Sequence, residues 1–209
     1  MKHFVVTIGR EFGSLGRAAG KQLAEELGVE FYDRDLVRKA ADRLGMYPYK
    51  LNELDESRPS VLSQYLFGST DVDKLIEEQS QIIRKLADEE SCIIIGRCSD
   101  YILRDRNDCL NVFIYSPDQI RLNHLLEVYR DREEYKGRLN TAEDYAAFEN
   151  DIRNLMNAVD KKRHEYYKYV SGTNRGERYH KDLILNSGTL GVDGVVKIIK
   201  AAVEYKFAD

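Results

Sequence analysis

Apolar and polar residues along the chain form two kinds of block. Short, uninterrupted apolar runs are typical of buried strands, and they fall at residues 4–8, 93–95, 112–115 and 183–185, with a weaker run at 29–32. The segments between them place apolar residues at helical spacing, most clearly at residues 17–27 and 72–86. Strands and helices that alternate in this way predict an α/β fold with parallel strands and crossover helices.

Two segments interrupt this alternation. Residues 45–70 contain two prolines and several charges, which predicts an irregular insertion of the kind that forms a substrate-side flap. Residues 141–170 carry apolar side chains at helical spacing, so we expect one long helix with Thr141 as its N-cap and Asp144 at N3. Residues 171–180 hold two glycines and mixed charges, and they predict a loop before the last strand.

Length and composition restrict the class of protein. With 209 residues and 43% hydrophobic content, the chain suits one domain, residues 1–209, rather than two. The net charge of -4 argues against a nucleic acid polymer as the main partner, because binding a phosphate backbone needs a clustered positive surplus. Any basic site is therefore expected to be local.

The sequence shows no pattern for export, membrane insertion or zinc binding. The run at residues 4–8 is too short for a signal peptide, and no later run reaches the roughly 18 residues that span a bilayer. We therefore expect a cytoplasmic protein without a membrane partner. Cys92, Cys98 and Cys109 form no C-x-x-C pair, and the histidines lack metal-ligand spacing, so neither a disulfide framework nor a zinc site is predicted.

A glycine-rich turn follows the first predicted strand. After Ile8 the chain reads G-R-E-F-G-S-L-G-R-A and then enters a helix. Between a strand and a helix, such a turn points backbone N–H groups into one concavity, and the helix adds its positive N-terminal end. The residues expected to bind nucleotide phosphates are Gly13, Ser14, Leu15, Gly16, Arg17 and Ala18. The alternative is an ordinary crossover turn that is rich in glycine.

The glycine turn (residues 13–16) differs from the Walker A pattern G-x-x-x-x-G-K-[ST] at the two positions that follow it. Arg17 stands where that pattern has lysine, and Ala18 stands where it has the hydroxyl that binds magnesium. Arginine can still pair with the β and γ phosphates, so we assign Arg17 a catalytic role. Magnesium would need another ligand, such as Ser14, Asp33 or water, and its site stays open.

A second candidate site follows the strand at residues 93–95, where the chain continues G-R-C-S-D. That strand delivers Gly96 and Arg97 to the carboxyl end of a parallel sheet, which is the edge where open α/β sheets bind ligands. Arg97 is therefore predicted to bind an anionic group of a substrate. The alternative is a surface arginine that caps a helix or pairs with Asp100.

A third candidate site lies near the end of the long helix. Arg163 follows Val159 by one helical turn and tends toward the apolar face, whereas Lys161 and Lys162 point away. In phosphoryl transfer a lid arginine can neutralise charge on the transferred group, and Asp160, three residues earlier, would hold it in place. The alternative is a basic cluster that complements the helix dipole.

With these motifs placed on an α/β frame, the chain resembles the cytidylate kinase-like family, a divergent branch of the P-loop nucleoside-monophosphate kinases. The resemblance runs nearly end to end. Its motifs are V-V-T-I-G-R-E-F-G-S-L-G-R-A-A-G-K-Q-L-A-E-E-L-G at 5–28, F-Y-D-R-D-L at 31–36, I-I-I-G-R-C-S-D-Y-I-L at 93–103, N-V-F-I-Y-S-P at 111–117, D-K-K-R-H-E-Y-Y-K-Y at 160–169 and D-L-I-L-N-S at 182–187.

The resemblance implies a P-loop NTPase-type fold with a five-stranded parallel sheet flanked by helices. It also implies a helical lid at about residues 140–175 and an irregular acceptor-side insertion at about 45–70. The implied reaction transfers the γ-phosphoryl group of ATP, with Mg²⁺, to CMP or dCMP. Arg97 would bind the acceptor monophosphate, with Asp33 and Asp100 as further substrate-side candidates. Arg163, paired with Asp160, would be the lid arginine.

Two other functions stay open at this point. One is a kinase that phosphorylates another small molecule. The other is a nucleotide-binding regulatory protein without turnover, motivated by Arg17, Ala18 and Cys98 at the positions described above. The sequence determines neither the base preference nor the oligomeric state.

Overall fold

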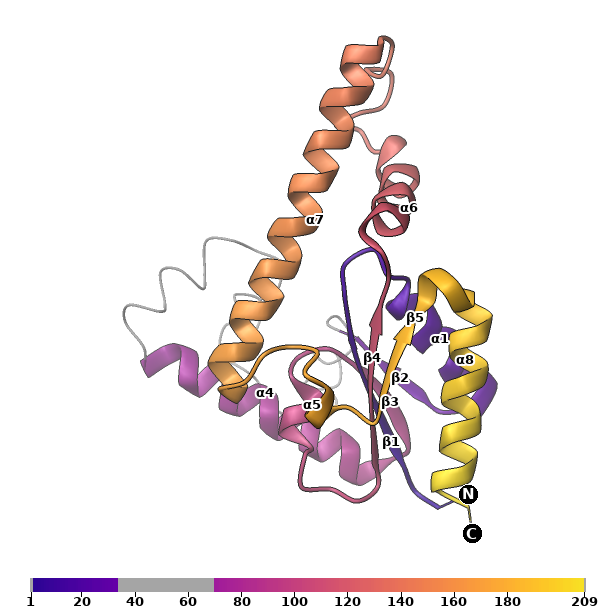
Figure 1. Cartoon of the computed structure of the whole chain (residues 1–209). Helices are drawn as coiled ribbons and strands as arrows, with labels where there is room; N and C mark the ends of the chain where they lie inside the picture. Colours follow the sequence, from indigo (N-terminus) through magenta and orange to yellow (C-terminus); the bar gives the residue numbers. More distant parts are fainter. Residues whose placement is uncertain (1, 34–69, 209) are drawn as a thin grey trace.

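Five parallel strands form a single sheet within the residues that the computed structural model describes, 2–33 and 70–208, in the order β2-β3-β1-β4-β5 (Figure 1). The strands are β1 (Val5–Arg10), β2 (Glu30–Tyr32), β3 (Cys92–Ile95), β4 (Cys109–Tyr115) and β5 (Leu183–Asn186). Every predicted run is a strand, although the weak run at 29–32 begins one residue later. The α/β fold and the five-stranded parallel sheet are thereby confirmed.

The central strand β1 aligns the ends of its neighbours. Val5 pairs with Cys92 on β3 and with Cys109 on β4, and all these pairings are parallel. β3 ends opposite Ile8, two residues before β1 ends at Arg10, and the N–H of Gly96 donates to the carbonyl of Ile8 at 3.0 Å. The turns that follow the two strands therefore leave the sheet at the same edge.

Helices cover both faces of the sheet (Figure 1). On one face, α1 (Gly16–Leu27) and α8 (Ser187–Lys206) bury an apolar core with the strands, including Leu23, Val196 and Ile199. On the other face, a second core unites the sheet with α4 (Thr70–Glu89), α5 (Ser99–Ile102) and the end of α7 (Ala142–Ser171). Successive strand residues serve opposite faces, as in the pair Val5 and Val6, which belong to different cores.

The helices α6 (Asp118–Arg130) and α7 form an arm that extends beyond the sheet (Figure 1). A third apolar cluster joins the two helices and consists of Leu122, Leu125, Phe148, Ile152 and Met156. The hydroxyl of Thr141 accepts the N–H of Asp144 at 3.1 Å, and the Asp144 carboxylate accepts the N–H of Thr141 at 2.8 Å. The predicted long helix and its N-cap are confirmed.

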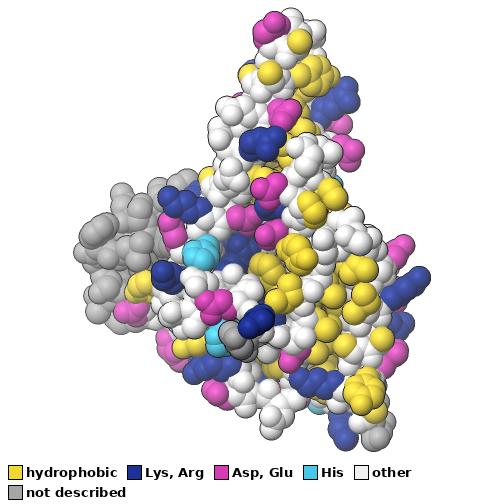
Figure 2. Space-filling view, viewed as in Figure 1, with side chains coloured by type: hydrophobic (Ala, Val, Ile, Leu, Met, Phe, Trp, Pro, Cys, Tyr) yellow, Lys and Arg dark blue, Asp and Glu magenta, His cyan; other side chains and the backbone are white. Residues whose placement is uncertain are grey.

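The remaining sequence predictions have mixed outcomes. Residues 45–69 of the predicted insertion lie outside the described residues. The predicted loop at 171–180 includes a short 3-10 helix, Arg178–His180. Across the two described ranges, no helix combines the length and apolar character needed to cross a membrane. Figure 2 shows basic and acidic side chains interspersed on the visible face, with hydrophobic side chains gathered over β5 and α8.

Candidate active site

The glycine turn joins β1 to α1 through a backbone that needs glycine. Gly13 has φ +83°, and a Cβ there would lie 3.0 Å from the carbonyl oxygen of Arg121. Gly16 begins α1 so close to the strand that a Cβ would lie 2.7 Å from the Cβ of Arg10. Both positions would clash with any larger residue, so the shape of the turn depends on these two glycines.

The first turn of α1 offers N–H groups to an anion. Leu15 occupies the N-cap position with φ 59° and makes no side-chain cap hydrogen bond. The N–H groups of Gly16, Arg17 and Ala18 lie in the first helical turn, where an α-helix has no carbonyl partner for them. Together with the helix dipole, these groups form the kind of concavity that binds phosphate.

The Ser14 side chain holds the turn in place through hydrogen bonds to the backbone. Its buried hydroxyl donates to the carbonyls of Glu11 at 2.9 Å and Ile114 at 3.2 Å. Its own carbonyl accepts the hydroxyl of Ser187 at 2.7 Å. The turn is therefore tied to β4 and to the start of α8, and the Ser14 side chain is engaged in holding it.

Arg17 and Asp33 contact each other. The Nε of Arg17 donates to the Oδ2 of Asp33 at 2.8 Å, and its Nη2 lies 2.5 Å from the same oxygen. The Arg17 side chain is 65% exposed, whereas that of Asp33 is 8% exposed. The sequence predicted that Arg17 binds the phosphate donor and that Asp33 binds the acceptor. In the structure the two residues form one ion pair beside the first turn of α1.

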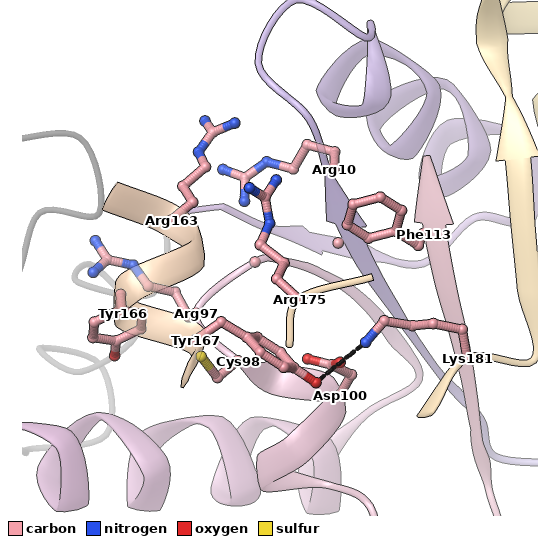
Figure 3. Close-up of a pocket in the computed structure, with 12 residues that line it drawn as sticks. Arg10, Arg97, Cys98, Asp100, Phe113, Arg163, Tyr166, Tyr167, Arg175 and Lys181 are labelled. Atoms are coloured by element: carbon pink, nitrogen blue, oxygen red, sulfur yellow. Dashed lines mark hydrogen bonds and ion pairs between the residues drawn. The ribbon is translucent and has the colours of Figure 1, made fainter. Parts of the chain in front are cut away.

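A cavity opens at the carboxyl ends of β1 and β3, beneath the end of α7 (Figure 3). Its lining contains three of the predicted residues, namely Arg97, Asp100 and Arg163. The other lining residues are Gly9, Arg10, Gly96, Cys98, Phe113, Tyr166, Tyr167, Arg175 and Lys181. The glycine turn, Arg17, Ala18, Asp33 and Asp160 lie outside this lining.

Arg97 lines the cavity from a bend in which three consecutive residues have a left-handed backbone conformation. The φ values of Gly96, Arg97 and Cys98 are 71°, 58° and 55°, and Cys98 then starts the short helix α5 as its N-cap. Left-handed conformations cost energy for residues other than glycine and cluster at functional sites. Gln79 supports the bend by donating to the Arg97 carbonyl at 3.4 Å and to the hydroxyl of Tyr166 at 2.8 Å.

The Asp160 carboxylate ties α7 to the segment that leads into the glycine turn. It accepts the N–H of Phe12 at 3.0 and 3.2 Å and lies 2.5 Å from Nη1 of Arg121. Nη1 of Arg175 lies 3.2 Å away and Nη1 of Arg163 lies 3.8 Å away. Asp160 and Arg163 do pair, but the shortest contact of Asp160 is with Arg121, which sequence reasoning missed.

Asp100 belongs to a buried cluster at the far side of the cavity. The hydroxyl of Tyr167 donates to the Oδ2 of Asp100 at 2.8 Å, and the Lys181 ammonium pairs with the same oxygen. Lys181 also donates to the Tyr167 hydroxyl at 3.3 Å. The side chains of Lys181 and Asp100 are only 1% and 9% exposed. Burial, reinforced by the Asp100 charge, raises the pKa of Tyr167 above its ordinary value.

The cavity thus has two distinct ends (Figure 3). At the arginine end, Arg10, Arg163 and Arg175 extend into the space beside the end of β1. At the paired end, Asp100, Tyr167 and Lys181 contact one another. Sequence reasoning missed four of these six residues. Of these four residues, Arg10 was the easiest to predict from sequence, because it follows a predicted strand inside the glycine-rich motif.

The described residues contain no group of three or more His, Cys, Asp or Glu side chains that could hold a metal ion. Mg²⁺ in kinases is commonly bound by one or two carboxylates together with the phosphates of the nucleotide. The described residues fit only that mode of binding, in which the nucleotide supplies most of the ligands.

Comparison with known proteins agrees with the sequence resemblance. Residues 5–189 match the model of the cytidylate kinase-like family. A cytidylate kinase of Archaeoglobus fulgidus is 26% identical over 203 residues, which cover 96% of this chain and 95% of that protein.

Two solved structures share the fold. An uncharacterized protein from Eubacterium ventriosum superimposes with a TM-score of 0.70 at 24% identity, over 97% of this chain and 99% of that one. A shikimate kinase from Bacteroides thetaiotaomicron gives a TM-score of 0.52 at 14% identity, over 96% of this chain and 98% of that one. The strand order, the glycine turn and the matched motifs lead to one assignment: the chain belongs to the cytidylate kinase-like family.

Proposed function

We propose that the protein transfers the γ-phosphoryl group of ATP to a nucleoside monophosphate, with CMP or dCMP as the preferred acceptor. The observation that carries the proposal is that Arg97, from the end of β3, and Arg163, from the lid helix, both line one cavity beside β1. Positive groups that approach from two elements suit an anionic acceptor and the charge that develops during transfer.

The donor would bind at the glycine turn. Its geometry supports this role, because Gly13 and Gly16 bring the backbone close and α1 begins without a side-chain cap. Arg17, in the first turn of α1, would break its ion pair with Asp33 and contact the donor phosphates instead. Mg²⁺ would arrive with the ATP phosphates, and the released Asp33 carboxylate is a candidate ligand.

The acceptor would lie in the cavity, with its phosphate at the arginine end. Arg97 and Arg163 would bind the acceptor and transferred phosphates, and Asp160 would hold the lid at the turn through the N–H of Phe12. CMP is favoured because the family is cytidylate kinase-like and the curated relative is named a cytidylate kinase. Asp100 at the paired end would contact the nucleoside part.

An acceptor panel tests this proposal. The protein is incubated with ATP, Mg²⁺ and each ribonucleoside and deoxyribonucleoside monophosphate, and diphosphate products are separated by ion-exchange chromatography. We expect the highest kcat/KM with CMP or dCMP. Absence of a diphosphate from every acceptor would refute the proposal. Product from a non-nucleotide acceptor alone would assign the protein to a different class of small-molecule kinase.

The donor site has a matched pair of glycine variants. Gly13→Ala and Gly137→Ala both place a side chain at a positive φ, +83° and +72°, but a Cβ at Gly137 meets nothing within 4 Å. We expect Gly13→Ala to weaken ATP binding at least tenfold by calorimetry and Gly137→Ala to leave it unchanged. Equal ATP affinity in both variants would place the donor site elsewhere.

A further inference from the structure

The chain that follows α7 turns back over the sheet by packing on Phe113. Gly176 has φ +82°, and a Cβ there would lie 3.3 Å from the Phe113 ring. On the other side of the same ring, a Cβ at Gly9 would lie 2.9 Å from the Phe113 Cδ2. The ring is therefore enclosed between two glycines, one at the end of β1 and one in the loop after the lid helix. This close packing holds the loop beside the cavity.

The loop packed in this way places Arg175 inside the arginine end. Its guanidinium lies 5.5 Å from the centre of the Phe113 ring, and its side chain is only 11% exposed. Nη1 pairs with Asp160 at 3.2 Å, whereas the buried Nη2 has no hydrogen-bond partner within the described residues. A buried guanidinium N–H without an acceptor is unfavourable, so an incoming anion oxygen would gain from binding there.

The charges that line the cavity favour the same ligand. Its described lining contains Arg10, Arg97, Arg163, Arg175 and Lys181 against one carboxylate, Asp100. That carboxylate contacts Lys181 at the paired end, away from the arginines (Figure 3). Asp160 lies outside the lining and is shared between Arg121, Arg163 and Arg175. Among the described lining residues, basic side chains therefore outnumber acidic ones, which suits a group with more than one negative charge.

We infer that Arg175 is a further phosphate-binding residue of this cavity, positioned by the Gly9, Phe113 and Gly176 contact and acting beside Arg10 and Arg163. The identity of the ligand as a nucleotide phosphate rests on the proposed function. The planar guanidinium can bind two phosphate oxygens, and it lies over the Phe113 ring. Neither the resemblance nor the sequence pattern assigned a role to this residue.

Calorimetry with pyrophosphate tests the inference without requiring turnover. The variants are Arg175→Ala, Arg175→Lys and, as control, Arg153→Ala, which removes an exposed lid-helix arginine paired with Glu149. We expect the dissociation constant to rise about tenfold or more for Arg175→Ala, less for Arg175→Lys, and not at all for Arg153→Ala. Unchanged affinity in a folded Arg175→Ala protein would overturn the inference, as would a wild-type protein that does not bind pyrophosphate.

Gly176→Ala tests whether the packing on Phe113 positions Arg175. Its Cβ would press on the ring at 3.3 Å and strain the positive φ, so we expect weaker pyrophosphate binding. In a double-mutant cycle, Gly176→Ala should have little further effect once Arg175 is alanine. Fully additive losses would overturn the positioning role. Pyrophosphate binding that depends on Arg175, in a protein without turnover on any acceptor, would retain this inference while refuting the proposed reaction.

Discussion

The two ends of the cavity use charge in opposite ways. At the paired end, Lys181 and Asp100 are buried together and Tyr167 completes their hydrogen bonds. At the arginine end, Arg163 and Arg175 both contact the Asp160 carboxylate, which also pairs with Arg121. A buried pair that is satisfied internally contributes to structure, whereas a cluster with surplus charge is suited to a ligand. The contrast separates residues whose loss should act mainly on catalysis from residues whose loss should act mainly on stability, and Asp100, which would also contact the nucleoside, belongs to the second group.

The largest effect is expected at the arginine end. Arg163→Ala should lower kcat by about 10²- to 10³-fold, because it removes a cation directed at developing negative charge. The Arg163 side chain is 12% exposed, so circular dichroism and thermal unfolding should accompany steady-state kinetics. Arg163→Lys should recover part of the rate. Full activity in Arg163→Ala would show that this residue takes no part in the transfer step. It would also contradict the catalytic role that we assign to the arginine end.

The next largest effect is expected on stability, at the paired end. Lys181→Met should reduce the free energy of unfolding by about 3 kcal/mol, because it leaves the buried Asp100 carboxylate without its cation. The double variant Lys181→Met, Asp100→Asn should recover a large part of that loss, since the amide is neutral and can still accept from Tyr167. Urea unfolding measures both. A single variant as stable as wild type would show that the pair is not the structural element we infer.

Salt concentration should affect the two ends of the cavity differently. Raising NaCl from about 0.05 M to about 0.5 M should weaken pyrophosphate binding several-fold, because mobile ions screen accessible charges and compete with the ligand. The stability lost in Lys181→Met should stay within about 0.5 kcal/mol of its low-salt value, because buried charges are screened much less. If the two quantities respond equally to salt, the distinction between the ends fails.

The smallest effect is expected from alkaline pH. Burial, followed by the Asp100 charge, raises the pKa of Tyr167 above the ordinary 10.0. The unfolded chain therefore loses this proton first, so the stabilising effect is present below pH 10 and decreases as pH rises through the folded pKa. Between pH about 9 and about 11, wild type should lose about 1 kcal/mol more than Tyr167→Phe. Parallel losses in urea unfolding at both pH values would contradict this assignment.

Local pattern predicted the strands and the long helix α7 well. The runs that became β1, β3 and β4 are continuous and apolar because both faces of the sheet are covered there, whereas Ile184 on the edge strand β5 is 41% exposed. The long helix carries its own start signal in Thr141 and Asp144, which are only three residues apart. Strand β2 is short and half-buried, so its apolar signal was weaker and its start was off by one residue.

The charged partners were predicted far less well. Arg17 pairs with Asp33 across 16 positions, Arg121 with Asp160 across 39, and Lys181 with Asp100 across 81. Arg175 lies in a loop where two glycines were visible in sequence, but its approach to the cavity depends on Phe113, a residue of β4. Of the ion pairs at the site, only that of Asp160 with Arg163 was predicted from sequence, because both residues lie on one helix three positions apart.

The sequence by itself determined the order of strands and helices along the chain, the position of the glycine turn after a buried strand, and the face of α7 that carries Arg163. Each of these follows from burial or spacing over a few residues. The tertiary structure decided which of 32 basic side chains meets which of 36 acidic ones. Ion pairs between distant elements carry no periodicity in sequence, and their partners are brought together by the packing of helices and loops on the sheet.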